Sequence, residues 1–158
     1  MSILKVDTIN EKTSGNGVLI PGHVVQVVQG SSNTETAIDG TTYLDTTLSA
    51  SITPKSTSSK ILIKVNQHFR LDRYGFSIRV LRGSTAIQEP AQKFAQYSAD
   101  ANDDLRGYHT YEILDSPSTT SAITYKTQAA NNVTSGAGNT IFNGNGFYSY
   151  LTLMEIAQ

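Results

Sequence analysis

Apolar and polar residues alternate along most of the chain after residue 22. The clearest segment is 60–69, in which Ile61, Ile63 and Val65 fall on one face and Lys64 and Asn66 fall on the other. A period of two is that of a β-strand, because successive side chains point to opposite sides of a sheet. The pattern therefore predicts strands with one buried face and one exposed face.

The same pattern recurs in short segments separated by turn-forming residues. We predict eight strands, at residues 23–29, 48–53, 60–69, 74–82, 93–98, 108–114, 121–129 and 147–156. The segments between them include 53–59, 82–84, 115–118 and the glycine-rich 135–146, and we expect none of these to contain a central strand. No segment keeps an apolar period of 3.6 residues, so no long helix is expected. The sequence therefore predicts an all-β fold, a jelly-roll-like β-sandwich.

The last predicted strand has large apolar side chains on both faces. Such a strand needs cover on both sides, and the second apolar face of a small protein is most simply covered by another copy of the chain. The alternative is a central strand of a single sandwich, covered by a second sheet and a long loop. On the first reading, the intersubunit interface comprises Tyr148, Tyr150, Leu151, Leu153, Met154 and Ile156.

Residues 1–22 differ from the rest of the chain. Two short β-prone runs, 2–9 and 18–20, flank a polar stretch and end at Pro21 and Gly22. A hairpin of this size is marginal in water, so it must dock on something else. We therefore predict an extended attachment arm at residues 1–22, followed by a head domain at residues 23–158. The residues expected to anchor the arm are Ile3, Val6, Asp7, Ile9, Val18 and Ile20.

Composition excludes several classes of function. Charged residues make up 16% of the chain and the formal net charge is −1, so no overall field attracts nucleic acid. The chain has no cysteine, which excludes disulfides, thiolate zinc sites and a cysteine nucleophile. The sequence has neither a long apolar run nor the apolar core of a signal peptide, so we expect neither membrane insertion nor export by the general secretory route.

Candidate catalytic and metal-binding residues are sparse. The histidines His23, His68 and His109 have no glycine-elbow serine or second metal ligand at a recurrent spacing, and we expect His68 to be a solvent-facing sheet residue. The acidic run at residues 100–104 could offer oxygen ligands to Ca²⁺, but it lacks the spacing of an EF-hand and is also ordinary loop composition. The sequence predicts no enzymatic activity, no cofactor and no metal site.

Tyrosine is the most suitable recognition residue, because the chain has eight tyrosines and no tryptophan. Its ring and hydroxyl suit both sugar faces and protein interfaces. Residues 96–111 combine several tyrosines with an arginine, and half-buried tyrosines at strand ends are the structural alternative. The candidate ligand contacts are Tyr97, Arg106, Tyr108 and Tyr111.

A set of motifs spread over most of the chain is similar to those of one class of proteins. The first run reads Asp7-Thr-Ile-Asn-Glu-Lys-Thr13, followed by Gly15-Asn-Gly-Val18. The later runs lie at residues 51–63, 80–87, 114–117, 124–126 and 151–156. Together they resemble the arm and the head domain of tail-fibre and other appendage proteins of tailed bacteriophages. The long repeated shaft of a full fibre has no counterpart here.

The resemblance implies a virion structural protein that assembles as a homotrimer. Its arm would attach to other virion proteins of the tail or capsid, and its head would project outward toward a host cell-surface polysaccharide. A capsid decoration protein that stabilises the shell is the alternative in the same setting. A free carbohydrate-binding module is the alternative from another class, although such a module has no use for an arm.

Overall fold

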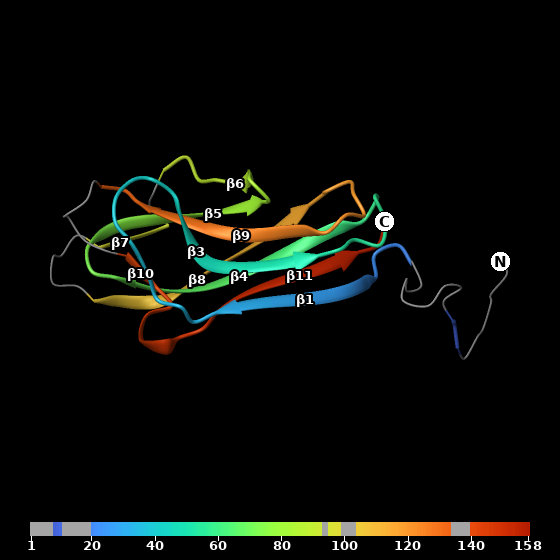
Figure 1. The fold of residues 1–158 in the computed structure, drawn as a ribbon, viewed down its shortest axis with the longest axis horizontal. Coiled ribbons are helices and arrows are strands. Elements are labelled where there is room, and N and C mark those ends of the chain that lie inside the picture. Colours follow the sequence, from blue (N-terminus) through green and yellow to red (C-terminus); the bar gives the residue numbers. More distant parts are fainter. Residues whose placement is uncertain (1–7, 11–19, 93–94, 99–103, 134–139) are drawn as a thin grey trace.

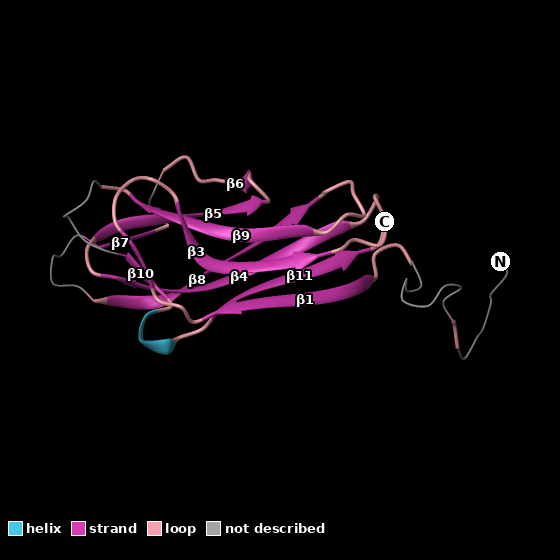
Figure 2. Cartoon of the chain, in the orientation of Figure 1, coloured by secondary structure: helices cyan, strands magenta, loops and turns pink. Residues whose placement is uncertain are grey.

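The computed structural model describes residues 8–10, 20–92, 95–98, 104–133 and 140–158. Figure 1 shows two layers of antiparallel strands packed face to face, which make a β-sandwich. Figure 2 shows that strands dominate the described chain, with one short helical turn, η1 (Gly144–Gly146), just before the last strand. The predicted all-β fold with a β-sandwich is therefore confirmed.

Sheet A contains the strands that carry the candidate site. Strand β4 (Lys60–Leu71) is central and pairs with β8 (Leu105–Asp115) along one edge. Its other edge pairs with β11 (Ser149–Ile156) and then with β10 (Thr140–Phe142). Strands β1 (Val24–Ser32) and β2 (Thr36–Ile38) lie outside β11 and β10 respectively.

Sheet B covers the inner face of sheet A. Its path runs from β3 (Leu44–Ile52) through β9 (Ile123–Asn131) and β5 (Tyr74–Arg82) to β6 (Thr85–Gln88). The short strand β7 (Gln96–Ser98) also pairs with β5. All eight predicted strands have a counterpart, although several ends differ by a few residues, and β2, β6 and β10 were not predicted.

One prediction about turn segments is wrong. The glycine-rich stretch 135–146 was expected to contain no central strand, yet β10 lies within it, between β4 and β2. The inward side chains of β10, Thr140 and Phe142, are fully buried. Three residues are too few to show an alternation of apolar and polar side chains. The burial of Phe142, rather than a sequence pattern, therefore accounts for the presence of a strand here.

Two apolar clusters form the core, with a polar layer between them. Along β4, Val65 belongs to the first cluster and Phe69 to the second, with Gln67 buried between them. The amide oxygen of Gln67 accepts a hydrogen bond of 2.8 Å from the hydroxyl of Thr127 on β9. Thr46 lies 2.5 Å from the same hydroxyl, oxygen to oxygen. Because these polar atoms are paired with one another, their burial costs little.

Strand β1 of sheet A and strand β3 of sheet B approach each other closely at Gly30. A Cβ atom placed on Gly30 would lie 1.9 Å from the backbone oxygen of Ser49. Real Cβ atoms do not approach an oxygen so closely, so this position requires glycine.

Strand β11 uses its two apolar faces differently. Leu151 and Leu153 are fully buried between the sheets, so their assignment to an intersubunit interface is wrong. Alternation at period two showed that both faces were apolar but could not show which one the second sheet covers. Tyr148, Tyr150, Met154 and Ile156 belong to the opposite, outward face.

The start of the head lies beside the carboxyl end of the chain. Ile20, Pro21, Gly22 and His23 form a turn closed by a 3.0 Å hydrogen bond from the His23 amide to the Ile20 oxygen. The Gly22 amide donates to the Ala157 oxygen at 2.8 Å. Of the predicted arm anchors, Ile9 and Ile20 are exposed, and Ile3, Val6, Asp7 and Val18 lie outside the described residues.

Candidate functional site

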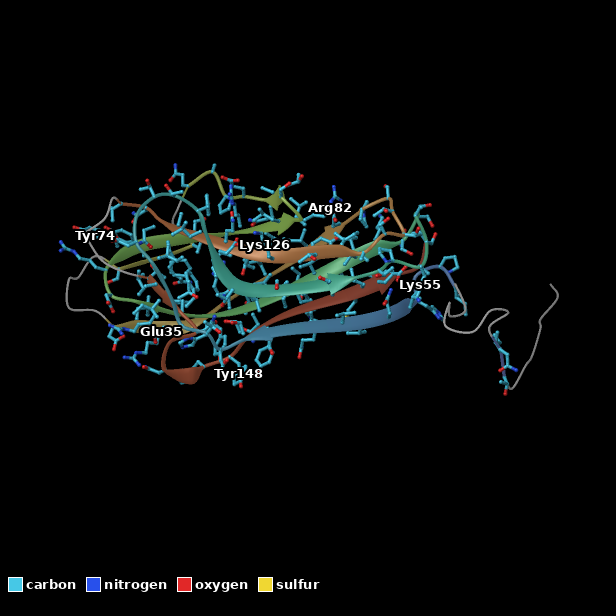
Figure 3. All side chains as sticks on the ribbon, in the orientation of Figure 1. Glu35, Lys55, Tyr74, Arg82, Lys126 and Tyr148 are labelled. Carbon is cyan, nitrogen blue, oxygen red and sulfur yellow. The ribbon has the colours of Figure 1, made fainter. Side chains whose placement is uncertain are left out.

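The outward face of sheet A carries the candidate site. Strands β1, β11, β4 and β8 are paired side by side, so their outward residues form rows across the sheet. Directly opposite residues of such strands have Cβ atoms about 4.5–5.5 Å apart. Figure 3 places Tyr148 on this side of the molecule and Arg82 on the side of sheet B. Three zones follow one another along the strands.

The first zone is an apolar row near the carboxyl end of the chain. In register across the sheet, Val27 lies opposite Met154, Met154 opposite Leu62, and Leu62 opposite Leu114. Val27 is 56% exposed and Leu114 is 53% exposed, and the other two are half-buried. We call these four residues the apolar row, and Ile156 extends it toward the end of β11. These apolar side chains form a continuous, solvent-exposed line across the four strands.

The second zone is a hollow of about 430 Å³, which we call the polar groove. One row of it holds Lys64 and Glu112, whose Nζ and Oε1 atoms lie 2.8 Å apart. The same row holds Gln29, whose Nε2 donates to Thr152 Oγ1 at 2.8 Å. The next row places Tyr150 opposite Asn66, and Asn66 opposite Thr110. These seven residues supply the polar lining of the groove.

The third zone is an aromatic cluster centred on His68. This imidazole stacks on Phe147, with ring centroids 4.5 Å apart and planes inclined by 13°. Tyr108 contacts it edge-on, with centroids 5.3 Å apart. The expectation that His68 faces solvent is wrong, because these two rings cover it and leave it 4% exposed. Burial first, and the nearby Arg106 cation second, lower the pKa of His68.

Arg106 lies beside this cluster, and its guanidinium group is paired with the carboxylate of Asp104. Its Nε atom donates to Asp104 Oδ1 at 2.8 Å, and the Nε of Arg70 lies 3.2 Å from the same oxygen. The hydrogen bond from Arg106 is the main reason why the pKa of Asp104 is lowered. Asp104 is the described part of the acidic run 100–104, and the rest of that run lies outside the described residues. Within the described ranges, no three metal-binding side chains gather in one place.

The structure brings together only two of the four candidate ligand contacts. Arg106 and Tyr108 share the outward face of β8, whereas Tyr97 lies on β7 in sheet B, opposite Gly75. Tyr111 points inward, where burial raises the pKa of its hydroxyl. The assignment of Tyr111 to an exposed contact surface is wrong, because odd positions of β8 face the core.

Sequence reasoning missed most of the polar groove. Gln29, Lys64, Asn66 and Glu112 belong to three strands far apart in the chain. Each has the appearance of an ordinary outward residue in its own strand. The pairing of β1, β11, β4 and β8 is the information that joins them.

No protein-family model matches this sequence, and no curated protein matches it. In the part of the chain that the structure describes, no helix combines the length and apolarity needed to cross a membrane.

Proposed function

We propose that this chain is the subunit of a short homotrimeric appendage on the particle of a tailed bacteriophage. Residues 1–22 attach it to the particle and residues 23–158 form the projecting head. The sequence motifs supply the phage setting and the threefold symmetry. The observation that carries the proposal is the apolar row, which offers a surface for a second copy.

The apolar row suits contact with another copy because of its position and composition. Val27, Met154, Leu62 and Leu114 cross the whole width of sheet A without an intervening polar residue. Moving a large aliphatic side chain from water into an interface contributes about 1.5–3 kcal/mol. Met154 and Ile156 keep the interface role that the sequence suggested for them. Tyr150 lies in the polar groove instead, and Tyr148 lies beyond it along the chain, so neither belongs to the apolar row.

The order of the strands supports a jelly-roll assignment for the head. The chain passes between the sheets so that β1, β11, β4 and β8 face β3, β9, β5 and β6. Two facing layers of four strands in such an order are typical of jelly rolls, a fold used in viral capsid domains, and here β2 and β10 extend one layer while β7 extends the other. This agreement favours a virion structural role over an isolated binding module.

The ends of the head support a division between attachment and recognition. The turn at Pro21 and Gly22 bonds to Ala157, so the arm joins the head where the chain ends. The apolar row lies near this end. Figure 2 shows η1 toward the opposite end, and Phe147 of the aromatic cluster directly follows η1 in the chain. An appendage attached through its arm would present the aromatic cluster outward.

Removal of the arm tests the proposal. A variant that begins at residue 23 should keep the circular dichroism of the full chain and its trimeric mass, yet fail to incorporate into particles. Labelled antibody in the electron microscope would locate the full chain on a tail or on the capsid, and a shell-wide distribution would favour capsid decoration instead. Normal incorporation of the shortened chain would contradict the attachment role of residues 1–22.

A further inference from the structure

The polar groove has the features of a binding site that the apolar row lacks. Its volume of about 430 Å³ falls within the roughly 300–1,000 Å³ of small-ligand pockets. Tyr150 and Asn66 lie opposite each other in its floor, with Thr110 next to Asn66. Among the described residues, the side chains of these three make no hydrogen bond, so their donors and acceptors remain available to a ligand.

The charges of the groove indicate an uncharged ligand. Lys64 is neutralised by Glu112, at 2.8 Å between Nζ and Oε1. No other charged residue belongs to the lining of this groove. A phosphate or an acidic polymer would therefore find no uncompensated cation, and a basic peptide would find no uncompensated carboxylate.

The aromatic rings beside the groove indicate a ligand with an apolar face. Tyr148 and Tyr150 are 46% and 37% exposed, and their ring planes differ by 20° with centroids 6.2 Å apart. Rings of this kind can lie against the C–H face of a sugar, while amide and hydroxyl groups bind its hydroxyls. An apolar face bordered by many hydroxyls is the chemistry of a saccharide.

We infer that the polar groove on β1, β11, β4 and β8 binds a neutral saccharide, with Tyr150 as the stacking residue and Asn66 and Thr110 as hydrogen-bonding residues. This inference rests on the proposed role of the head in meeting a host surface. It places the contact on the middle of sheet A, where Thr110 is the only one of the three named contacts that comes from the segment 96–111 suggested by the sequence. Of the earlier candidates, Arg106 and Tyr108 lie on the same face, and Tyr108 is the nearer of the two to Thr110 along β8.

Affinity electrophoresis of the full chain tests the inference directly. Native gels containing dextran, mannan or galactomannan offer neutral polysaccharides, and a gel containing alginate offers an anionic one. At least one neutral polysaccharide should retard the protein, and alginate should not. Retardation by alginate alone, or by none of the neutral polymers, would overturn the inference.

Variants then locate the site. Tyr150→Ala and Asn66→Ala should each weaken binding by roughly three- to tenfold, which corresponds to the loss of one stacking contact or one hydrogen bond. Tyr97→Ala is the matched control, because Tyr97 is an exposed tyrosine on sheet B and its loss should leave binding unchanged. Equal loss in the control would overturn the assignment to the groove.

The mass of each variant keeps this test separate from that of the proposed function. Light scattering should show the same oligomer for Tyr150→Ala and Asn66→Ala as for the wild-type chain. If Asn66→Ala instead dissociates the oligomer, the groove belongs to the contact between copies and the saccharide site is refuted. A wild-type chain that binds a neutral polysaccharide as a monomer would refute the trimer and leave the groove assignment standing.

Discussion

The imidazole of His68 lies nearly parallel to the ring of Phe147, with 4.5 Å between the ring centroids. Phe147 immediately precedes Tyr148 and the start of β11, so this contact joins the last connection of the chain to the central strand β4. Phe147 itself remains 48% exposed, and it shields the histidine while staying open to solvent.

Replacement of Phe147 by alanine should expose His68. Burial is the main cause of its lowered pKa, so loss of the covering ring should move the pKa upward, toward the ordinary value of 6.5. Titration of the imidazole by nuclear magnetic resonance measures this change. Phe147→Tyr is the matched control, because its ring can still stack, and an unchanged His68 pKa in Phe147→Ala would contradict the shielding role.

Acid should destabilise the head through His68, which is buried, and His109, which is half-buried. Burial lowers the pKa of His109, as it does that of His68. As pH falls below about 6.5, the unfolded chain therefore binds protons before the folded chain does, and the free energy of unfolding decreases. The decrease should stop once pH passes below the folded pKa values. Urea unfolding at a series of pH values measures the effect, and a His68→Phe, His109→Phe double variant should have a flatter profile in this window.

The contact between β1 and β3 should not tolerate a side chain at position 30. Gly30→Ala would force its Cβ against the backbone oxygen of Ser49, and we expect a loss of about 3 kcal/mol or more of unfolding free energy. Gly107→Ala is the control, because its Cβ would lie at an ordinary 3.6 Å from the Phe69 ring. Chemical denaturation of both variants compares them, and equal stabilities would contradict the close approach of the two strands.

Strands were predictable from the sequence where one face is apolar and the strand is long enough for the alternation to recur several times. Ile61, Ile63 and Val65 share one face of β4, and Lys60, Lys64 and Asn66 share the other, so its inward face followed from the sequence. Strand β10 has only three residues, and no period can be recognised in so short a segment. The burial of Leu151 between the sheets could not be predicted either, because both faces of β11 are apolar.

The candidate site could not be predicted from the pattern within any single strand, because its residues come from several paired strands. Tyr111 points inward because the odd-numbered residues of β8 are on the side that sheet B covers. The sequence of β8 alone does not show which of its two sides is covered. The groove needs the register that places Tyr150 opposite Asn66 and Asn66 opposite Thr110. Pairing between strands distant in the sequence sets this register, and an isolated sequence pattern does not contain it.

Glu155 should be a stability determinant although it lies on the strand predicted to be apolar. It is fully buried, and its carboxylate accepts hydrogen bonds from the Lys55 amide at 2.7 Å and from Gln26 Nε2 at 2.5 Å. Glu155→Ala leaves these donors without an acceptor and should cost about 2–4 kcal/mol. Glu112→Ala, which removes an exposed ion pair with Lys64, should cost less than about 1 kcal/mol. Thermal or urea unfolding that ranks the two equally would contradict the buried role of Glu155.

Light scattering during size-exclusion chromatography tests the central claim most directly. At micromolar concentration the full chain should have a mass three times its own 17.1 kDa. Leu62→Lys in the apolar row should dissociate it to a monomer with unchanged circular dichroism, because a charge there would have to be buried between copies. Leu44→Lys, at an exposed leucine on sheet B, should remain trimeric. A monomeric mass for the wild-type chain would contradict the account.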